Sequence, residues 1–210
     1  MIKVIIADDH ELVREGIKRI LRRERGIRVV AEAASVAELL GTVETCDADV
    51  LILDVNFPAR SGLDALVELS RKERKPAVVM LTVYPEDRFA LAAFKAGALA
   101  YVSKASAAAD LVSAVRSAAA GERHLSPVVV DLLAHKLSDP RGGAPHENLS
   151  AREAQILSMI GAGKPARRIA TELSIGVNTV NTYRARILKK MRMRTSAELI
   201  RYAIERGLAG

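Results

Sequence analysis

The chain has 210 residues, more than a typical single domain of about 100–150 residues, so we expect two domains that each bury a core. Its single cysteine, Cys46, excludes an internal disulfide framework, and there is no run of about 18 apolar residues that would predict a membrane span. The N-terminus has no basic and apolar leader, so we expect a cytoplasmic protein without a membrane partner.

The net charge of +7 is concentrated at one end of the chain. Residues 1–123 carry 18 basic and 18 acidic side chains, whereas residues 149–210 carry 12 basic and four acidic ones. A small basic module beside a neutral one suggests that the C-terminal part contacts a polyanion, with nucleic acid as the leading candidate. A solvated basic face is the alternative interpretation of the same charge.

Apolar runs alternate with segments of helical period through the first part of the chain. Strands that alternate with helices predict right-handed βαβ units and a parallel sheet covered on both faces. We therefore expect an α/β domain over residues 1–121 with a five-stranded, doubly wound parallel sheet. The expected strands cover 2–7, 28–34, 50–55, 77–82 and 98–103.

Polar side chains stand at the ends of four of these runs. Asp8 and Asp9 follow the first run, Asp54 ends the third, Thr82 the fourth, and Lys104 follows the fifth. Ligands of open α/β sheets gather outside the carboxyl ends of the strands, so these groups are expected at one edge. A single such residue often only caps a helix or begins a turn, but five of them at the correct ends favour a shared site.

The strand-end residues predict a magnesium site for phosphoryl transfer. Clustered carboxylates repel one another unless a hard divalent cation lies between them, so we expect Mg²⁺ here. Asp54 is best placed as the nucleophile, because Asp8 and Asp9 would hold the metal from the neighbouring strand. Lys104 would pair with the phosphoryl oxygens, and the Thr82 hydroxyl could hydrogen-bond to them. This set suits Mg²⁺-assisted phosphoryl transfer onto a carboxylate.

Residues 122–148 predict a linker that contains a short helix. That helix is expected over 127–137 with Pro127 in its first turn, and the segment 138–145 breaks every periodic pattern.

The remaining residues, 149–210, predict a small all-α domain. Ser150 followed by Glu153 forms the pattern of a capping box, which starts a helix at about residue 150. Three further helices are expected over 165–173, 177–192 and 196–206.

The first domain resembles a known family in the order and spacing of its strand-end residues. The residues that carry this resemblance to the receiver domain of bacterial two-component response regulators are Asp8-Asp9-His10, Asp54, Thr82, Tyr101 and Lys104. The resemblance implies a CheY-like fold and phosphorylation of Asp54 by a sensor histidine kinase. It also implies Mg²⁺ ligands, directly or through water, from Asp8, Asp9, Asp54 and the backbone carbonyl of Asn56.

Thr82 and Tyr101 resemble the switch pair of that family. In such a pair the hydroxyl moves to the phosphoryl group and the aromatic ring swings inward behind it. Without the resemblance, Tyr101 is equally well interpreted as a half-buried strand residue. Many receivers have proline after the lysine, whereas Ala105 follows Lys104 here, which leaves the conformation of this peptide bond open.

The second domain resembles the LuxR-type helix-turn-helix of the NarL/FixJ regulators. The matching segments are 149–163, 169–173 and 177–184, and the run Asn181-Thr182-Tyr183-Arg184 is closer to the GacA/UvrY-like branch than to better-known members. The resemblance implies that the helix over 177–192 enters the major groove of double-stranded promoter DNA. Asn181 stands where a lysine is common, so the preferred DNA sequence is expected to differ from that of better-known members.

Base edges and phosphates should be contacted by different residues of this helix. We assign Asn181 and Thr182 to base edges and most of the basic residues to phosphates, because phosphate contacts position the protein and base contacts specify the sequence. Tyr183 either contacts a phosphate or packs. The predicted DNA-binding residues are Thr179, Asn181, Thr182, Tyr183, Arg184, Arg186, Lys189 and Lys190.

The last helix carries more apolar residues than a three-helix motif needs to bury. The resemblance implies a homodimer on activation, with Leu199, Ile200 and Ala203 as the contact. Additional core within one chain is the alternative.

These observations predict a transcription regulator that is controlled by phosphorylation and has at most its own phosphoryl transfer and autodephosphorylation as catalysis. The alternative is a DNA-binding regulator that ignores phosphorylation and keeps its receiver as a structural domain. An aspartyl phosphatase would need a second acid where Asn56 stands, and a flavodoxin-like FMN carrier would need a phosphate loop where Asp8 and Asp9 stand.

Overall fold

The computed structural model describes residues 1–57, 60–83, 86–106, 108–138, 144–173 and 175–209. The chain divides into two compact units, Met1–Ser138 and Asp139–Gly210. Residues 122–138, which were expected to be part of the linker, group with the first unit. Most of the segment expected to break the chain's periodicity, 139–143, lies outside the described residues.

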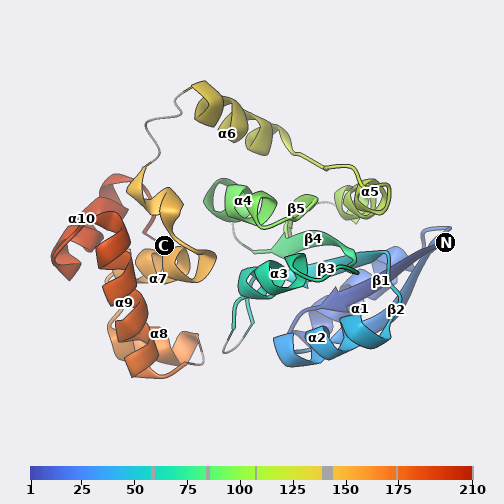
Figure 1. Ribbon diagram of the computed structural model, residues 1–210, viewed down its shortest axis with the longest axis horizontal. Helices are drawn as coiled ribbons and strands as arrows, with labels where there is room; N and C mark the ends of the chain where they lie inside the picture. The colour runs from blue at the N-terminus through green and yellow to red at the C-terminus, as the bar shows by residue number, and fades with distance from the viewer. Residues whose placement is uncertain (58–59, 84–85, 107, 139–143, 174, 210) are drawn as a thin grey trace. The chain divides into compact units, whose positions relative to one another are not determined.

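The first unit contains a five-stranded parallel sheet, which confirms the predicted fold class (Figure 1). The strand order is β2-β1-β3-β4-β5. The second strand therefore lies on one side of β1, and the later strands are added on its other side. Strand boundaries lie within about two residues of the predicted runs. The strands are β1 (Ile2–Ala7), β2 (Ile27–Ala33), β3 (Val50–Asp54), β4 (Ala77–Thr82) and β5 (Ala100–Ser103).

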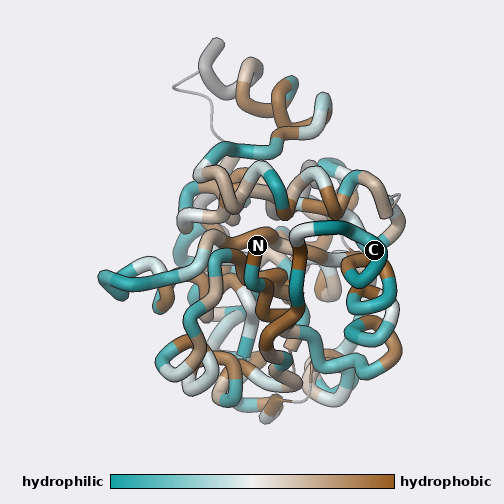
Figure 2. The backbone as a smooth tube through the Cα atoms, turned by 90° about the vertical axis from the view of Figure 1, so that its right-hand side faces the viewer, coloured by the Kyte–Doolittle hydropathy of each residue, from teal (hydrophilic) through white to brown (hydrophobic). Residues whose placement is uncertain are grey.

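Helices cover both faces of the sheet, because alternate strand residues point to opposite sides. On one face, residues such as Ile6, Ile52 and Val102 form a core with helices α1 (Glu11–Leu21) and α5 (Ala108–Ala119). The other face carries buried residues such as Leu51, Met80 and Tyr101. Helices α2 (Val36–Thr45), α3 (Gly62–Ser70) and α4 (Glu86–Lys95) belong to that side. The strands are drawn largely in the hydrophobic colour in Figure 2, as expected for a sheet buried on both faces.

Both edges of the sheet are irregular. At one edge, the register of β1 with β2 shifts between Val4 and Ile5, so that Val30 is an extra residue in β2. At the other edge, the segment after α5 lies along β5, where the His124 backbone N–H donates to the Leu99 carbonyl at 2.9 Å. The helix that follows is α6 (Pro127–Ser138), which begins with proline as predicted and lies against α4.

The second unit is a bundle of four α-helices preceded by the short 3₁₀ helix η1 (Pro145–Asn148). The predicted capping box is present: the Ser150 side chain accepts from the Glu153 N–H, and the Glu153 carboxylate accepts from the Ser150 N–H at 2.7 Å. The helices are α7 (Ala151–Gly161), α8 (Ala166–Glu172), α9 (Val177–Met191) and α10 (Ser196–Glu205).

The residues of the predicted dimer contact on α10 pack within their own unit. Leu199 and Ala203 are fully buried in the core of their own unit, and Ile200 packs against that core from its edge. The packing on α7 is so close that a Cβ at Gly161 would lie 2.5 Å from the Ala203 Cβ. These residues are therefore additional core, the alternative left open by the sequence, and among the large apolar residues of α10 it is Ile204 that is exposed, at 61%.

Among the described residues, no helix is long and apolar enough to cross a bilayer.

Candidate functional site

Three charged side chains meet at the carboxyl edge of the sheet. Asp8 follows β1, Asp54 ends β3 and Lys104 follows β5. The strands are parallel and β1 pairs directly with β3, so their carboxyl ends lie side by side. Both carboxylates are buried, with side chains only 1% exposed, while Lys104 is 15% exposed. The parallel topology therefore brings together groups that are 46 and 50 positions apart in the sequence.

Lys104 bridges the two buried carboxylates. Its Nζ lies 2.6 Å from Oδ2 of Asp8 and 2.8 Å from Oδ2 of Asp54. The loop that carries it is held by its own backbone, since the Lys104 N–H donates to the Thr82 carbonyl at 2.6 Å. No peptide bond between described residues is cis, so the Lys104–Ala105 bond, left open by the sequence, is trans.

Burial changes the acid–base properties of this cluster. It raises the pKa of Asp54 from 3.8 to about 6, although the positive charge of Lys104 acts in the opposite direction. Burial alone would lower the pKa of Lys104, but Asp54 and Asp8 outweigh it and raise that pKa above its usual value. Near neutral pH both groups are therefore charged, and Asp54 keeps the form that can act as a nucleophile.

The arrangement of oxygen atoms fits a divalent cation. Ligand atoms of Asp8, Asp9, His10 and Asp54 all lie within 4.8 Å of one another. Oδ1 of Asp54 is buried and makes no hydrogen bond of standard geometry, although the backbone of Asn56 favours its charged form. An unsatisfied buried carboxylate oxygen beside two other carboxylates is what a hard cation with oxygen ligands requires.

His10 is a member of this cluster to which the sequence analysis assigned no role. Its Nδ1 lies 2.9 Å from Oδ1 of Asp9 and 3.3 Å from Oδ1 of Asp8, and its side chain is 64% exposed. The signal was available, because His10 directly follows the acidic pair. Its backbone N–H also donates to Oδ1 of Asp8 at 2.9 Å, which fixes that carboxylate.

The loop after Asp54 depends on a glycine. A Cβ at Gly62 would lie 1.8 Å from the backbone oxygen of Asp54, so no larger residue fits without a shift of the main chain. The Gly62 N–H donates to the Val55 carbonyl at 2.9 Å, and Ser61 caps α3 by accepting from the Leu63 N–H. The N-terminus of α3 is thereby held directly against the expected phosphoacceptor.

Thr82 and Tyr101 lie inside the unit. Thr82 ends β4 and is completely buried, and Tyr101 in β5 is 2% exposed. The interpretation of Tyr101 as a half-buried strand residue is therefore wrong. Since Ala100 and Val102 join the core with α1 and α5, Tyr101 points to the opposite side of the sheet, to which α4 belongs.

Helix α9 presents most of the predicted DNA-binding residues to solvent. Asn181 and Tyr183 are partly buried, and the Arg186 guanidinium lies 5.8 Å from the centre of the Tyr183 ring. The Thr182 hydroxyl donates to the Asn178 carbonyl at 2.9 Å, which leaves its oxygen as an acceptor. The exposed members of the set are Thr179, Thr182, Arg184, Arg186, Lys189 and Lys190.

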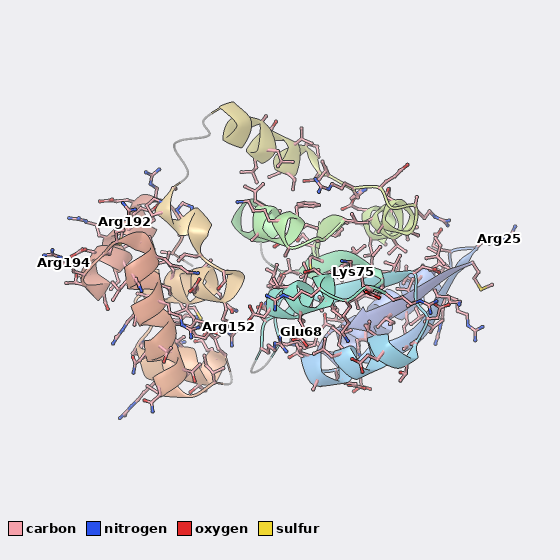
Figure 3. The ribbon with its side chains drawn as sticks, in the orientation of Figure 1. Arg25, Glu68, Lys75, Arg152, Arg192 and Arg194 are labelled. Carbon is pink, nitrogen blue, oxygen red and sulfur yellow. The ribbon has the colours of Figure 1, made fainter. Side chains whose placement is uncertain are left out.

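Two further cations stand just beyond α9. Arg192, which ends the helix in a left-handed conformation with φ 55°, and Arg194 both project away from the helices of their unit (Figure 3). Lys190 differs from its neighbours, because its Nζ lies 2.6 Å from Oε2 of the buried Glu153.

Comparison with known families divides the chain in the same way. Residues 4–116 match the response regulator receiver domain, and residues 147–203 match the bacterial regulatory proteins of the luxR family. Response regulator UvrY of Escherichia coli K12 is 36% identical over 99% of this chain and 96% of its own. Response regulator GacA of Pseudomonas aeruginosa is 37% identical over 99% of this chain and 98% of its own.

A solved structure covers nearly the whole chain. RcsB of Salmonella enterica serovar Typhimurium, bound to promoter P1flhDC in the presence of phosphomimetic BeF3-, superposes with a TM-score of 0.65 and 25% identity. The alignment spans 96% of this chain and 97% of that one.

Proposed function

Because the chain belongs to the two-component response regulators with a LuxR-type DNA-binding domain, we propose that phosphorylation of Asp54 by a sensor histidine kinase controls its binding to promoter DNA. The protein is a DNA-binding transcription regulator, and its chemistry acts on its own carboxylate. One observation carries the proposal: Asp54 is held beside Asp8 and Lys104 in the same chain that carries the exposed basic helix α9.

In the proposed transfer, a carboxylate oxygen of Asp54 attacks phosphorus. A new P–O bond forms while the P–N bond to the kinase histidine breaks, and the histidine nitrogen recovers a proton. Lys104, already 2.8 Å from Asp54, would pair with an oxygen of the arriving phosphoryl group. The aspartyl phosphate would carry more negative charge than the carboxylate it replaces, so Lys104 would help to neutralise that added charge in a buried site.

We infer that Mg²⁺ is the cofactor, held by Asp8, Asp9, Asp54 and the backbone carbonyl of Asn56. When bound, it would supply positive charge for the phosphoryl oxygens. Oδ1 of Asp54 supports this assignment, because that oxygen is buried without a hydrogen bond of standard geometry. The contact of His10 with Asp9 suggests that His10 orients this partly buried carboxylate.

The proposed switch runs from Thr82 to Tyr101. Thr82 is buried at the same carboxyl edge as Asp54, and β4 pairs with β5 so that Thr82 lies opposite Ser103. A hydroxyl drawn toward a phosphoryl group at Asp54 would leave space that the neighbouring aromatic ring can fill. Because Tyr101 is already buried here, its movement would be a repacking of the α4 side of the sheet.

For DNA recognition we propose that α9 enters the major groove, with Asn181 and Thr182 at base edges. Thr179, Tyr183, Arg184, Arg186 and Lys189 would contact phosphates, and their exposure supports this for all but the partly buried Tyr183. Domain boundaries of 1–121, 122–148 and 149–210 remain our proposal, supported by the ranges of the two family matches.

We also propose a homodimer on activation and a cytoplasmic location, where DNA and the kinase are both accessible. The buried Leu199 and Ala203 cannot form the dimer contact without opening their own core, so another surface is needed. Two half-site contacts would bind DNA far more tightly than one, because the second becomes intramolecular.

The test compares wild type with Asp54→Ala, with and without Mg²⁺ plus beryllofluoride. DNA affinity and molecular mass are measured by fluorescence anisotropy and light scattering. The proposal requires that Mg²⁺ plus beryllofluoride raise both the DNA affinity and the molecular mass of wild type, and neither quantity in Asp54→Ala. Equal binding in all four conditions would support a phosphorylation-independent regulator with a structural receiver domain.

A further inference from the structure

The first turn of α7 contains two adjacent charged residues that are both buried. Arg152 and Glu153 are each only 3% exposed. Charged side chains are rarely buried unless they are paired and hydrogen-bonded, because removal of a charge from water is costly. Both therefore need an explanation, and each one reaches a different helix of the helix-turn-helix.

Arg152 reaches the end of α8. One of its guanidinium nitrogens donates to the Leu173 carbonyl at 3.1 Å, and another donates to Oε1 of Gln155 at 2.7 Å. Leu173 is the C-cap of α8, directly before the turn that leads to α9. Arg152 thus fixes the point at which the first helix of the motif ends.

Glu153 reaches the last turn of α9. Its Oε2 accepts from the Ser150 N–H at 2.7 Å and from Nζ of Lys190 at 2.6 Å. The carboxylate side chain is 4% exposed and Lys190 is 43% exposed, so the contact joins a buried anion to the ammonium group of a partly exposed lysine. The same carboxylate therefore caps α7 and holds α9.

The position of Lys190 on the helix separates it from the predicted DNA contacts. Lys189 follows the exposed Thr182 by seven residues and shares its side of α9. Lys190 follows Tyr183 by seven residues and shares the side that packs against the core. Two neighbouring lysines thus point in different directions, and Lys190 is the one that contacts a buried carboxylate.

We propose that Glu153 and Lys190 form a positioning contact that sets the orientation of α9 for base recognition, and that Lys190 makes no phosphate contact. This inference rests on the proposed use of α9 as the recognition helix. A directional pair with a buried carboxylate defines one orientation of α9, whereas apolar contacts such as those of Val180 and Ile187 tolerate small rotations. Arg152 acts in parallel at the end of α8.

The test measures DNA affinity at several salt concentrations, with a duplex selected by wild type from a random pool and an unrelated duplex as the non-specific competitor. Each phosphate contact contributes about 0.9 to the slope of log K against log salt concentration. The full-length variants are Lys190→Met, Lys190→Arg, Glu153→Gln and, as the matched control, Lys189→Met. Gln at position 153 preserves the capping box, so Glu153→Gln removes the charge pair and keeps the start of α7.

Lys189→Met should reduce the slope by about 0.9. Lys190→Met should leave the slope unchanged and weaken binding to the selected duplex about tenfold, with non-specific binding retained. Glu153→Gln should give the same loss. The double variant that combines Glu153→Gln with Lys190→Met should lose no more than either single variant, and Lys190→Arg should bind like wild type. A slope reduced by about 0.9 in Lys190→Met would overturn the inference, as would wild-type specificity in Glu153→Gln. If wild type itself shows no sequence preference, the proposed function fails first.

Discussion

The Lys104 ammonium lies 2.8 Å from the carboxylate of Asp54, so the expected phosphoacceptor is held in an ion pair before any phosphodonor arrives. Asp8, at 2.6 Å from the same ammonium, competes for this cation. A phosphoryl group added at Asp54 would therefore share this single lysine with Asp8.

Asp54→Asn should stabilise the protein, and by more at high pH. Burial raises the pKa of Asp54 to about 6, above its value of 3.8, so the folded state binds the proton more tightly than the unfolded state. Ionised Asp54 therefore lowers stability progressively from about pH 4 to pH 6, and the penalty stays constant above that. Urea unfolding in EDTA at pH 4.5 and 7.5 should show a benefit of the variant that grows by about 2 kcal/mol between the two pH values. A benefit that is independent of pH would contradict this.

Lys104→Met should destabilise the first unit by about 3 kcal/mol in EDTA at pH 7.5, because two buried carboxylates would face each other without a cation. Added Mg²⁺ should raise the melting temperature of this variant more than that of wild type, because a ligand of the folded state stabilises by mass action. Differential scanning calorimetry over a Mg²⁺ titration measures both effects. Identical Mg²⁺ responses would show that Lys104 does not compete for the cation's position.

Gly62→Ala should slow phosphorylation by a small phosphodonor and lower the melting temperature, because the new Cβ would meet the Asp54 backbone oxygen at 1.8 Å. Gly41→Ala is the control. Gly41 lies inside α2 with nothing within 4 Å of an added Cβ, so that substitution should stabilise by about 0.5–1 kcal/mol. Equal phosphorylation rates in the two variants would mean that the loop adapts to the added methyl group.

Leu199→Ala should lower the free energy of unfolding of the second unit by about 2–5 kcal/mol at every protein concentration, because Leu199 is fully buried. Ile204→Ala, on the exposed side of the same helix, should change it by less than about 0.5 kcal/mol. Chemical unfolding at two protein concentrations distinguishes a residue of the core from a residue of a dimer interface, because only the second effect depends on protein concentration. If Leu199→Ala instead weakened only a dimer, the unfolding of the monomer would be unaffected.

Asn181→Ala should reduce the preference for one base pair of the selected duplex by about 1–3 kcal/mol and leave the salt dependence unchanged. Arg186→Gln should weaken all duplexes similarly and reduce the salt slope by about one. Binding to a panel of single-base substitutions of the duplex checks both. A uniform loss for Asn181→Ala would assign it to the backbone of DNA.

The fold and the acidic site were predictable because both depend on short-range signals in parallel strands. Apolar runs such as 77–82 mark buried strands almost to the residue, and parallel topology brings their final residues to one edge. The last run was predicted from residue 98, but β5 starts at Ala100, because Ala98 is buried before the strand begins. An apolar, buried residue can therefore belong either to a strand or to the loop that leads into it.

Residues of the second unit were harder to assign, because one signal has two physical meanings there. An apolar helix side such as Leu199 and Ala203 looks the same whether it packs within the chain or against a second copy. Likewise, the capping-box pattern identified Glu153 as a cap, yet its second partner, Lys190, lies 37 positions later. A lysine on a recognition helix suggests a contact with DNA. Only the contact of Lys190 with the buried Glu153 carboxylate indicates another role for this lysine.

The irregular edges of the sheet limit how two copies of this protein can associate. An open edge strand invites pairing with the same strand of another molecule, which leads to aggregates rather than to a defined dimer. Here the extra Val30 distorts β2, and the segment at His124 occupies part of the free edge of β5. Both ends of the sheet are thus poor templates for a further strand, so association through β-sheet extension is disfavoured at either edge.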